Sequence, residues 1–219
     1  MLSVAIDGPA GVGKSTVSKL VAKKLGWHCL DTGALYRAIA VACQRAKIDI
    51  NNIDEVKALL KTIEIDVKFK DGLQHTYLNG EDVTKYLRTE EIDMLASVTS
   101  AYKEVRDSII DLQRNLAKKE NLVVEGRDIT SNVLKDSKNK FYLDASPEER
   151  ANRRYKERLA RGEEVDYQDI LEDLIQRDKN DMTRKIAPLV CTSDSIRIDT
   201  TKLTIDQVVD KMLENIKLN

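Results

Sequence analysis

Residues that build metal centres and acyl-transfer sites are scarce in this 219-residue sequence, which holds two histidines and three cysteines. The cysteines, Cys29, Cys43 and Cys191, are far apart and do not combine with the histidines at the spacing of a zinc site. Because His28 and His75 are the only histidines, we do not expect a nucleophile–histidine pair for acyl transfer. We interpret the cysteines as reduced thiols and expect no metal–thiolate centre.

An excess of charge of either sign is also absent, because 36 lysines and arginines face 37 acidic residues and leave a formal net charge of −1. Such a chain has no overall attraction to nucleic acid or to a membrane surface. No apolar run approaches membrane-spanning length, and a first strand from about Ser3 leaves no room for a charged leader. We therefore expect a cytoplasmic protein without a nucleic-acid or membrane partner. Because no apolar seam is evident, we expect a monomer.

A glycine-rich loop stands near the start of the sequence. Its residues are Gly8, Pro9, Ala10, Gly11, Val12, Gly13, Lys14, Ser15 and Thr16, and they fit G-x-x-x-x-G-K-[ST] without a gap. An apolar run precedes the loop and helical periodicity follows it, which places the loop between a buried strand and a helix N-terminus. A Rossmann dinucleotide loop is the alternative, with Asp31 at about the distance of a ribose-binding acid. That alternative gives Lys14 and Ser15 no role.

This loop predicts a bound nucleoside triphosphate and Mg²⁺. Glycines let successive backbone N–H groups curl around an anion, and the following helix adds the positive end of its dipole. Lys14 would reach the β- and γ-phosphates, and the Ser15 hydroxyl would offer an oxygen to Mg²⁺.

Strands and helices alternate along most of the chain. Strands are expected at about 3–6, 27–30, 122–124, 141–143 and 195–199. Helices are expected at about 17–25, 35–46, 90–116, 146–162, from 166 past 175, and 204–216. This alternation predicts an α/β fold with a doubly wound parallel sheet of five strands.

A stretch with a different period interrupts this order. Between Ile63 and Asn79 apolar residues alternate with polar ones, and Asp71-Gly72 supplies a turn, which predicts an antiparallel β insert. Residues 83–87 are predicted as a third short strand. We expect a single domain over residues 1–219, with a core of 1–62 and 90–219, an insert at about 63–89 and a helical lid at about 148–168.

Arginines follow the expected carboxyl ends of the strands, where ligands bind in such a sheet. Arg37 comes after the second strand and Arg127 closes the third, and two converging guanidinium groups would hold a monophosphate. Arg177, Asp181 and Arg184 share a helix face by their spacing, which fits either a binding surface or intrahelical ion pairs.

The helix from Ser146 onward is rich in arginine and glutamate. These charges fit either a solvated helix or a mobile lid that carries cations over a triphosphate.

A phosphate dianion is already a nucleophile near neutral pH, so transfer of a phosphoryl group between two nucleotides needs no dedicated base. A GTPase would carry an N-K-x-D signature, which is absent from the sequence. An ATPase acting on a protein would need a partner-facing surface, and nothing marks one.

The whole chain resembles the bacterial cytidylate kinases, which are P-loop proteins of the nucleoside monophosphate kinase group. The resemblance lies in blocks of sequence that follow in one order, at residues 6–9, 30–37, 78–83, 126–128, 143–146, 149–151, 177–178 and 187–189. It implies transfer of the γ-phosphoryl group of ATP, with Mg²⁺, to CMP or dCMP, which gives ADP and CDP or dCDP.

The resemblance also implies roles for individual residues. The acceptor phosphate would be held by Thr32, Arg37, Arg127 and Arg184, the ribose by Arg177 and Asp181, and the cytosine by Ser97, Arg106 and Asp128. Lys14 and the lid arginines Arg153, Arg154 and Arg158 would form the catalytic set. A carboxylate accepts a hydrogen bond from the amine of cytosine and is left unpaired before the carbonyl of uracil, which favours CMP over UMP.

The sequence departs from the family pattern at two places. After residues 126–129 the family usually continues Gly-Thr, whereas Thr130-Ser131 stand here. Met182 stands where a small polar residue is common. These departures affect the expected backbone course beyond Asp128 and the support of Asp181 and Arg184.

Overall fold

A five-stranded parallel sheet forms the centre of the protein in a computed structural model that describes residues 1–218. Its strands are β1 (Ser3–Asp7), β2 (His28–Asp31), β6 (Leu122–Glu125), β7 (Asn139–Asp144) and β8 (Ile196–Asp199). They lie in the order β2-β6-β1-β7-β8, and every neighbouring pair is parallel. The predicted five-stranded parallel sheet is confirmed.

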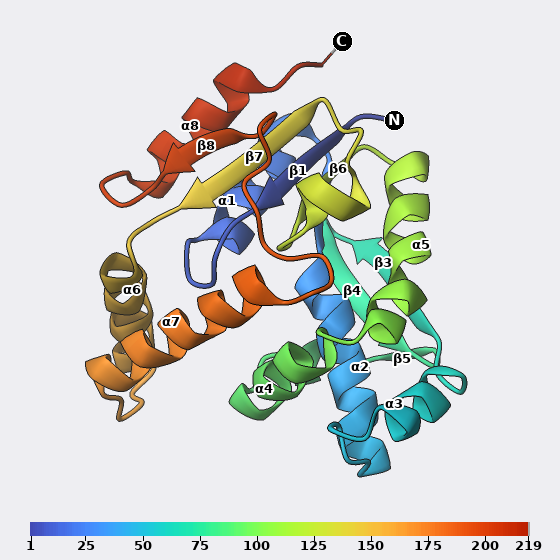
Figure 1. Ribbon diagram of the computed structural model, residues 1–219. Coiled ribbons are helices and arrows are strands. Elements are labelled where there is room, and N and C mark those ends of the chain that lie inside the picture. Colours follow the sequence, from blue (N-terminus) through green and yellow to red (C-terminus); the bar gives the residue numbers. More distant parts are fainter. Residues whose placement is uncertain (219) are drawn as a thin grey trace.

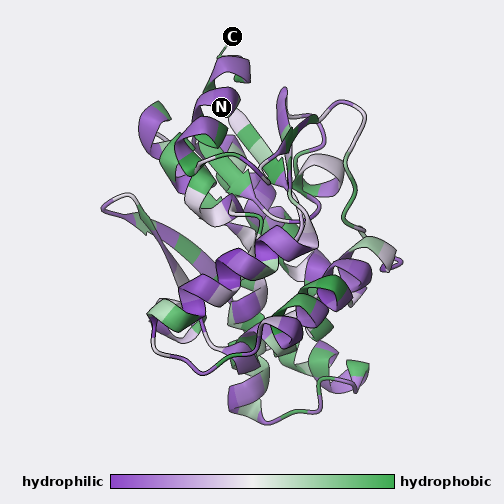
Figure 2. Cartoon of the chain, turned by 90° about the vertical axis from the view of Figure 1, so that its left-hand side faces the viewer, coloured by the Kyte–Doolittle hydropathy of each residue, from purple (hydrophilic) through white to green (hydrophobic). Residues whose placement is uncertain are grey.

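Helices cover both faces of this sheet (Figure 1). Val4 and Ile6 of β1 pack with α1 (Lys14–Leu25) and α8 (Ile205–Asn215), whereas Ala5 packs on the other face with α2 (Thr32–Ala46) and α5 (Lys103–Lys119). A strand buried on both faces has apolar side chains at successive positions, which explains the uninterrupted apolar runs in the sequence. In Figure 2 hydrophobic stretches gather in these strands, and the surrounding helices carry long hydrophilic stretches. The doubly wound arrangement is therefore also confirmed.

The insert is a separate antiparallel sheet of β3 (Ile65–Lys70), β4 (Leu73–Leu78) and β5 (Glu81–Asp82). The predicted hairpin is present, but the prediction of a third strand at residues 83–87 is wrong. The short strand β5 comes earlier and a 3₁₀ turn, η1 (Thr84–Tyr86), follows it. Val83 and Leu87 are both buried in one cluster with α2 and are four residues apart, which is the spacing of a helical turn.

The single long helix predicted from residue 90 is also wrong, because the chain forms two helices, α4 (Glu90–Thr99) and α5. Between them the Tyr102 hydroxyl donates a hydrogen bond to the carbonyl of Ile50 at 2.9 Å. The helix α3 (Ile53–Leu60) was not predicted, although Ile53, Val56, Leu59 and Leu60 follow helical spacing and pack in the same core cluster.

Two helices, α6 (Pro147–Ala160) and α7 (Tyr167–Thr183), lie below the carboxyl ends of the strands in Figure 1. Ser146 caps α6 by accepting the Glu149 N–H, with Pro147 at the first helical position as predicted. The expectation that Arg184 continues the α7 face is wrong, because α7 ends at Thr183 and Arg184 has an extended backbone.

Both ends of the described chain lie at the amino ends of the strands. The backbone N–H of Leu2 donates to the side chain of Asn121 at 2.8 Å. The side chain of Asn139, at the start of β7, accepts the N–H of Lys217 and donates to its carbonyl. Figure 1 shows the two termini on the same side of the molecule.

Candidate active site

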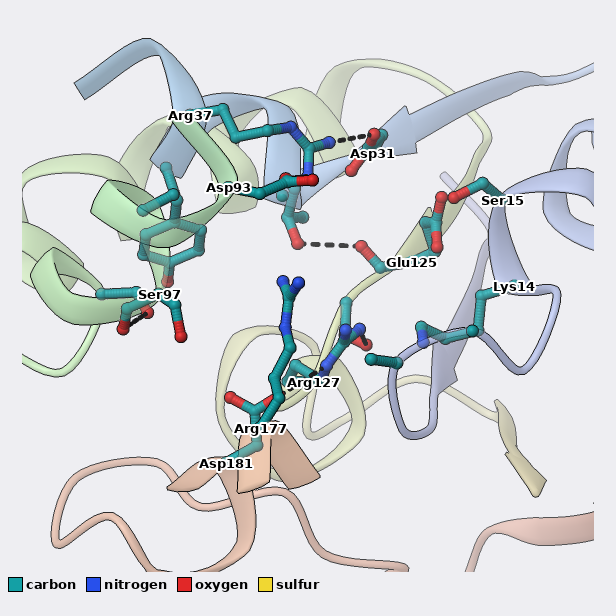
Figure 3. A pocket seen from close by; sticks show the side chains of 18 of the residues that line it. Lys14, Ser15, Asp31, Arg37, Asp93, Ser97, Glu125, Arg127, Arg177 and Asp181 are labelled. Carbon is teal, nitrogen blue, oxygen red and sulfur yellow. Dashed lines mark hydrogen bonds and ion pairs between the residues drawn. The ribbon is translucent and has the colours of Figure 1, made fainter. Parts of the chain in front are cut away.

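A pocket of about 370 Å³ lies at the carboxyl ends of β1, β2 and β6, and helices α4 to α7 complete its wall (Figure 3). The structure brings most of the predicted residues together in this wall: 10–16, Thr32, Arg37, Ser97, Arg106, Arg127, Asp128, Arg154, Arg177, Asp181 and Arg184. The predicted residues outside the lining are Gly8, Pro9, Arg153 and Arg158. The pocket is thus continuous from the glycine-rich loop to the expected base-binding residues.

The loop requires glycine at its first and sixth positions. A Cβ on Gly8 would lie 2.2 Å from the carbonyl oxygen of Leu143, so no side chain fits there. Gly13 has a φ of 94° and precedes α1, whose N-terminus has no side-chain cap. The free N–H groups of the first helical turn and the helix dipole therefore face the pocket as an anion site.

Lys14 is folded against the same loop. Its ammonium group donates to the carbonyl oxygens of Gly8 at 2.8 Å and Pro9 at 2.7 Å. Burial lowers the pKa of Lys14 to about 7, and the charge of Arg127 acts in the same direction. A phosphate at this place would favour the charged ammonium, because it supplies an opposite charge in a site that is shielded from water.

Glu125, at the end of β6, was not predicted as a site residue. Burial raises the pKa of its carboxyl group, whereas a hydrogen bond from the Ser15 hydroxyl acts in the opposite direction. Figure 3 shows the two side chains next to each other. Hydroxyl and carboxylate oxygens are the hard ligands that Mg²⁺ prefers. Within residues 1–218 no group of three or more His, Cys, Asp or Glu could hold a metal ion, so phosphates and water would have to complete the coordination. The signal in the sequence was an acidic residue directly after an apolar strand.

Two carboxylates flank Arg37. Its guanidinium pairs with Asp31 at 2.8 Å and with Asp93 at 3.6 Å. Asp31 also pairs with Arg88. Burial alone would raise the pKa of Asp31, but the charges of Arg37 and Arg88 lower this pKa below its usual value. The β insert supports this point, because the Gln74 side chain bonds the backbone N–H and carbonyl of Asp31.

Arg177 points into the centre of the pocket from α7 (Figure 3). It forms no hydrogen bond or ion pair with any residue in 1–218, whereas Arg127 beside it pairs with Asp181 at 2.9 Å. Burial and the charge of Arg127 lower the pKa of Arg177. An anion between the loop and Arg37 would supply the partner that Arg177 lacks.

The far end of the pocket holds a buried charge cluster. Asp128 pairs with Arg106 at 2.5 Å and with Arg184 at 3.5 Å, and Ser97 lines the same end. The buried Nε atoms of Arg37 and Arg106 have neither a hydrogen-bond partner nor an ion-pair partner within residues 1–218. Buried donors are normally satisfied, so these nitrogens fit a ligand with acceptor atoms.

The three lid arginines have different surroundings. Arg153 pairs with Glu149 and donates to the carbonyl of Thr200 at 2.7 Å, away from the pocket wall. Arg158 pairs with Glu163 and with Glu90. Arg154 lines the pocket and has no hydrogen bond or ion pair with any residue in 1–218.

Arg150 fixes the rotation of α6 against the loop. It is buried, pairs with Asp178 of α7 at 2.6 Å and donates to the carbonyl of Ala10 at 2.8 Å. The N–H of Ala10 donates in turn to Asp178. This contact sets which of the neighbouring arginines faces the pocket.

The family model for cytidylate kinases matches residues 4–218. The chain belongs to the cytidylate kinase family. It is 46% identical over 213 residues to the cytidylate kinase of Caldicellulosiruptor saccharolyticus, covering 97% of this chain and 94% of that protein. It is 42% identical over 217 residues to the cytidylate kinase of Bacillus subtilis (strain 168), covering 99% and 96%.

A solved structure supports the fold of this cytidylate kinase family member. The crystal structure of an uncharacterized protein from Eubacterium ventriosum ATCC 27560 aligns over 100% of both chains, with a TM-score of 0.56 and 14% identity. This likeness concerns the fold alone. Within residues 1–218, no helix of this family member combines the length and the apolar character needed to cross a membrane.

Membership in the cytidylate kinase family makes the chain a nucleotide-binding kinase that uses ATP.

Two further pocket residues were not predicted from the sequence. Asp93 was not predicted because this residue follows Glu90 and Glu91 in an acidic first turn that fits any helix start. Arg88, which lies at the edge of the insert, was not predicted either. Of the two departures from the family pattern, Met182 is 46% exposed and outside the pocket lining, whereas Thr130 is buried.

Proposed function

We propose that this chain transfers the γ-phosphoryl group of ATP to CMP or dCMP, giving ADP and CDP or dCDP. The observation that carries the proposal is the single continuous pocket, which joins a triphosphate-binding loop to an arginine cluster and a buried Arg106–Asp128 pair. Its relatives at 46% and 42% identity are named cytidylate kinases. Donor and acceptor would share one water-poor site, in which positioning and charge neutralisation supply most of the catalysis.

The acceptor phosphate would lie among Arg37, Arg127 and Arg184, with the Thr32 hydroxyl at its side. Its dianion is the nucleophile and needs no protein base. Guanidinium groups bind phosphate oxygens in pairs, which would aim the attacking oxygen at the γ-phosphorus. The resemblance implies a ribose contact for both Arg177 and Asp181. We keep that role for Asp181, whereas the position of Arg177 in the centre of the pocket favours a bridge between this phosphate and the donor.

Cytosine would lie at the far end of the pocket, against Ser97, Arg106 and Asp128. Asp128 would accept from the exocyclic amine, and Arg106 would donate to the ring acceptors. UMP would present a carbonyl to the Asp128 carboxylate, and two acceptors without a proton between them disfavour binding.

Mg²⁺ would be held by the Ser15 hydroxyl, with Glu125 beside it and phosphate oxygens as further ligands. When bound, the ion would neutralise negative charge on the β- and γ-phosphates. Residues 8–16 would hold the triphosphate through backbone N–H groups, and Lys14 would contact its transferred end.

We propose Arg154 as the lid arginine that contacts the transferred phosphoryl group, because it lines the pocket and has no protein partner in residues 1–218. Replacing Arg154 with glutamine is expected to lower kcat by about 100-fold or more, in line with the loss of a charged donor to the transition state. Steady-state kinetics with saturating ATP and CMP would measure this effect.

Arg153→Gln is the matched control, since Arg153 occupies the next position of the same helix but bonds Glu149 and Thr200. This variant is expected to keep kcat within about threefold of the original, as a surface ion pair contributes little. Equal losses of kcat in the two variants would contradict the assignment of Arg154.

The division of the chain is part of the same proposal: a core of residues 1–62 and 90–219, an acceptor-side insert at about 63–89 and a lid at about 148–168. The insert contributes Arg88 to the pocket and supports Asp31 through Gln74. A monomeric state and a cytoplasmic location stay predictions.

The decisive experiment is a coupled assay of ADP release with ATP as donor and CMP, dCMP, UMP, AMP, GMP and dTMP as acceptors. CMP and dCMP are expected to give the highest kcat/KM. A different best acceptor would refute the choice of base, and ADP release that needs no acceptor would refute the two-nucleotide mechanism.

A further inference from the structure

The segment after β6 carries Arg127 and Asp128 and then forms one π-helical turn, η2 (Ile129–Val133). Such turns are rare and are frequent at functional sites. Asp128 itself has φ −141° and ψ 28°, outside helix and strand, and its carbonyl accepts the backbone N–H groups of Asn132 at 2.9 Å and Val133 at 3.1 Å. Its carboxylate accepts a side-chain N–H of Asn132 at 3.0 Å and pairs with Arg106 and Arg184, while the residues on either side hold its backbone.

The carboxylate of Asp7 holds the residues that follow Asp128. One oxygen accepts the backbone N–H of Ile129 at 2.9 Å. The other accepts the N–H of Thr130 at 2.8 Å and the Thr130 hydroxyl at 2.6 Å. Asp7 is 0% exposed and Thr130 is 1% exposed, so water does not compete for these three bonds.

The residues that precede Asp128 are held from the other side. The Thr32 hydroxyl donates to the carbonyl of Glu125 at 2.8 Å. A Cβ on Gly126 would lie 2.6 Å from the Thr32 hydroxyl oxygen, so α2 contacts this backbone directly. Asp128 thus lies in a short segment that is fixed at both ends.

Asp7 is also the last residue of β1 and directly precedes Gly8 of the phosphate loop. One buried carboxylate therefore connects the loop of the donor side with the segment of the acceptor side. Thr130, a departure from the family pattern, supplies the side-chain bond in this connection.

We propose that Asp7 and Thr130 are positioning residues, which place the Asp128 carboxylate for cytosine and thereby set the preference for CMP. The inference rests on the proposed function, because it takes Asp128 as the residue that contacts the base. Neither Asp7 nor Thr130 lines the pocket, so both act through the backbone of residues 128–130.

The test compares Thr130→Val with Thr130→Ser. Valine keeps the shape and removes the hydroxyl, whereas serine keeps the hydroxyl. Thr130→Val is expected to raise KM for CMP about tenfold and to lower the ratio of kcat/KM for CMP over UMP by a similar factor, with KM for ATP within about twofold. Thr130→Ser is expected to restore both CMP parameters to within about twofold of the original chain.

Thr76→Val is the matched control, because Thr76 is also 1% exposed and its hydroxyl accepts one bond, from Gln74 in the insert. It should leave the CMP-over-UMP ratio unchanged. An unchanged ratio in Thr130→Val, or equal rises of KM for CMP and ATP, would overturn the inference. If Thr130→Val does not fold, Thr130→Ala is measured in its place, since it removes the hydroxyl without adding an atom. Failure of the original chain to prefer CMP would instead count against the proposed function.

Discussion

Replacing Lys14 with alanine is expected to lower kcat by about 10³-fold or more, because the variant loses the cation that would contact the transferred phosphoryl group. The ammonium lies inside the phosphate loop, on the carbonyls of Gly8 and Pro9. In phosphoryl transfer the protein contributes little covalent chemistry, so the loss of one positioned charge removes a large part of the catalysis. Steady-state kinetics with saturating ATP and CMP would measure the effect.

Lys23→Ala is the control for this variant. Lys23 lies in the last turn of the same helix and is exposed. It is expected to leave kcat within about twofold, because an exposed charge far from the phosphates is screened. Circular dichroism would establish that both variants fold. A folded Lys14→Ala protein that retained most of its turnover would refute the proposed donor site.

Replacing Asp128 with asparagine is expected to change the choice of base rather than the use of ATP. The amide has the shape of the carboxylate but can turn its NH₂ group toward the carbonyl of uracil. We expect KM for CMP to rise about 10- to 100-fold, since a buried charged acceptor is lost, while KM for ATP stays within about twofold. The preference for CMP over UMP should fall by a similar factor.

Steady-state kinetics with CMP and UMP at saturating ATP would measure this change. Asp136→Asn is the matched control, because Asp136 is an exposed carboxylate a short distance along the same segment. Equal weakening of ATP and CMP would contradict the base-binding role of Asp128. So would an unchanged preference between the two acceptors.

The sheet and the phosphate loop could be predicted because their signals are local. The loop pattern fixes a strand before Gly8 and a helix after Lys14, and strands buried on both faces stand out as apolar runs. The convergence of Arg37 and Arg127 could also be predicted from the sequence, because the carboxyl ends of parallel strands lie at one edge of the sheet. Family resemblance added Ser97 of α4 and Arg106 of α5, which no local pattern connects, and it assigned a binding role to Arg177 and Asp181 of α7, whose shared face the spacing had indicated.

The remaining features depend on contacts between distant segments. Arg153 and Arg154 are neighbours in sequence, and the contacts of Arg150 with Ala10 and Asp178 determine which of them faces the pocket. The break between α4 and α5 is hidden because the apolar stripe of α5 can be extended backward across residues 100–102. Thr130 departs from the family pattern, and no local signal in the sequence predicts its bond to Asp7, which is 123 residues away.

The position of the two chain ends has a practical consequence for single-molecule work. Leu2 and Lys217 are held at the amino ends of the strands, whereas the pocket lies at the carboxyl ends. The five residues of β1 span about 16 Å between these edges. A fluorophore or a surface linker attached beside either residue would leave the entrance of the pocket free, so immobilised molecules should turn over as they do in solution.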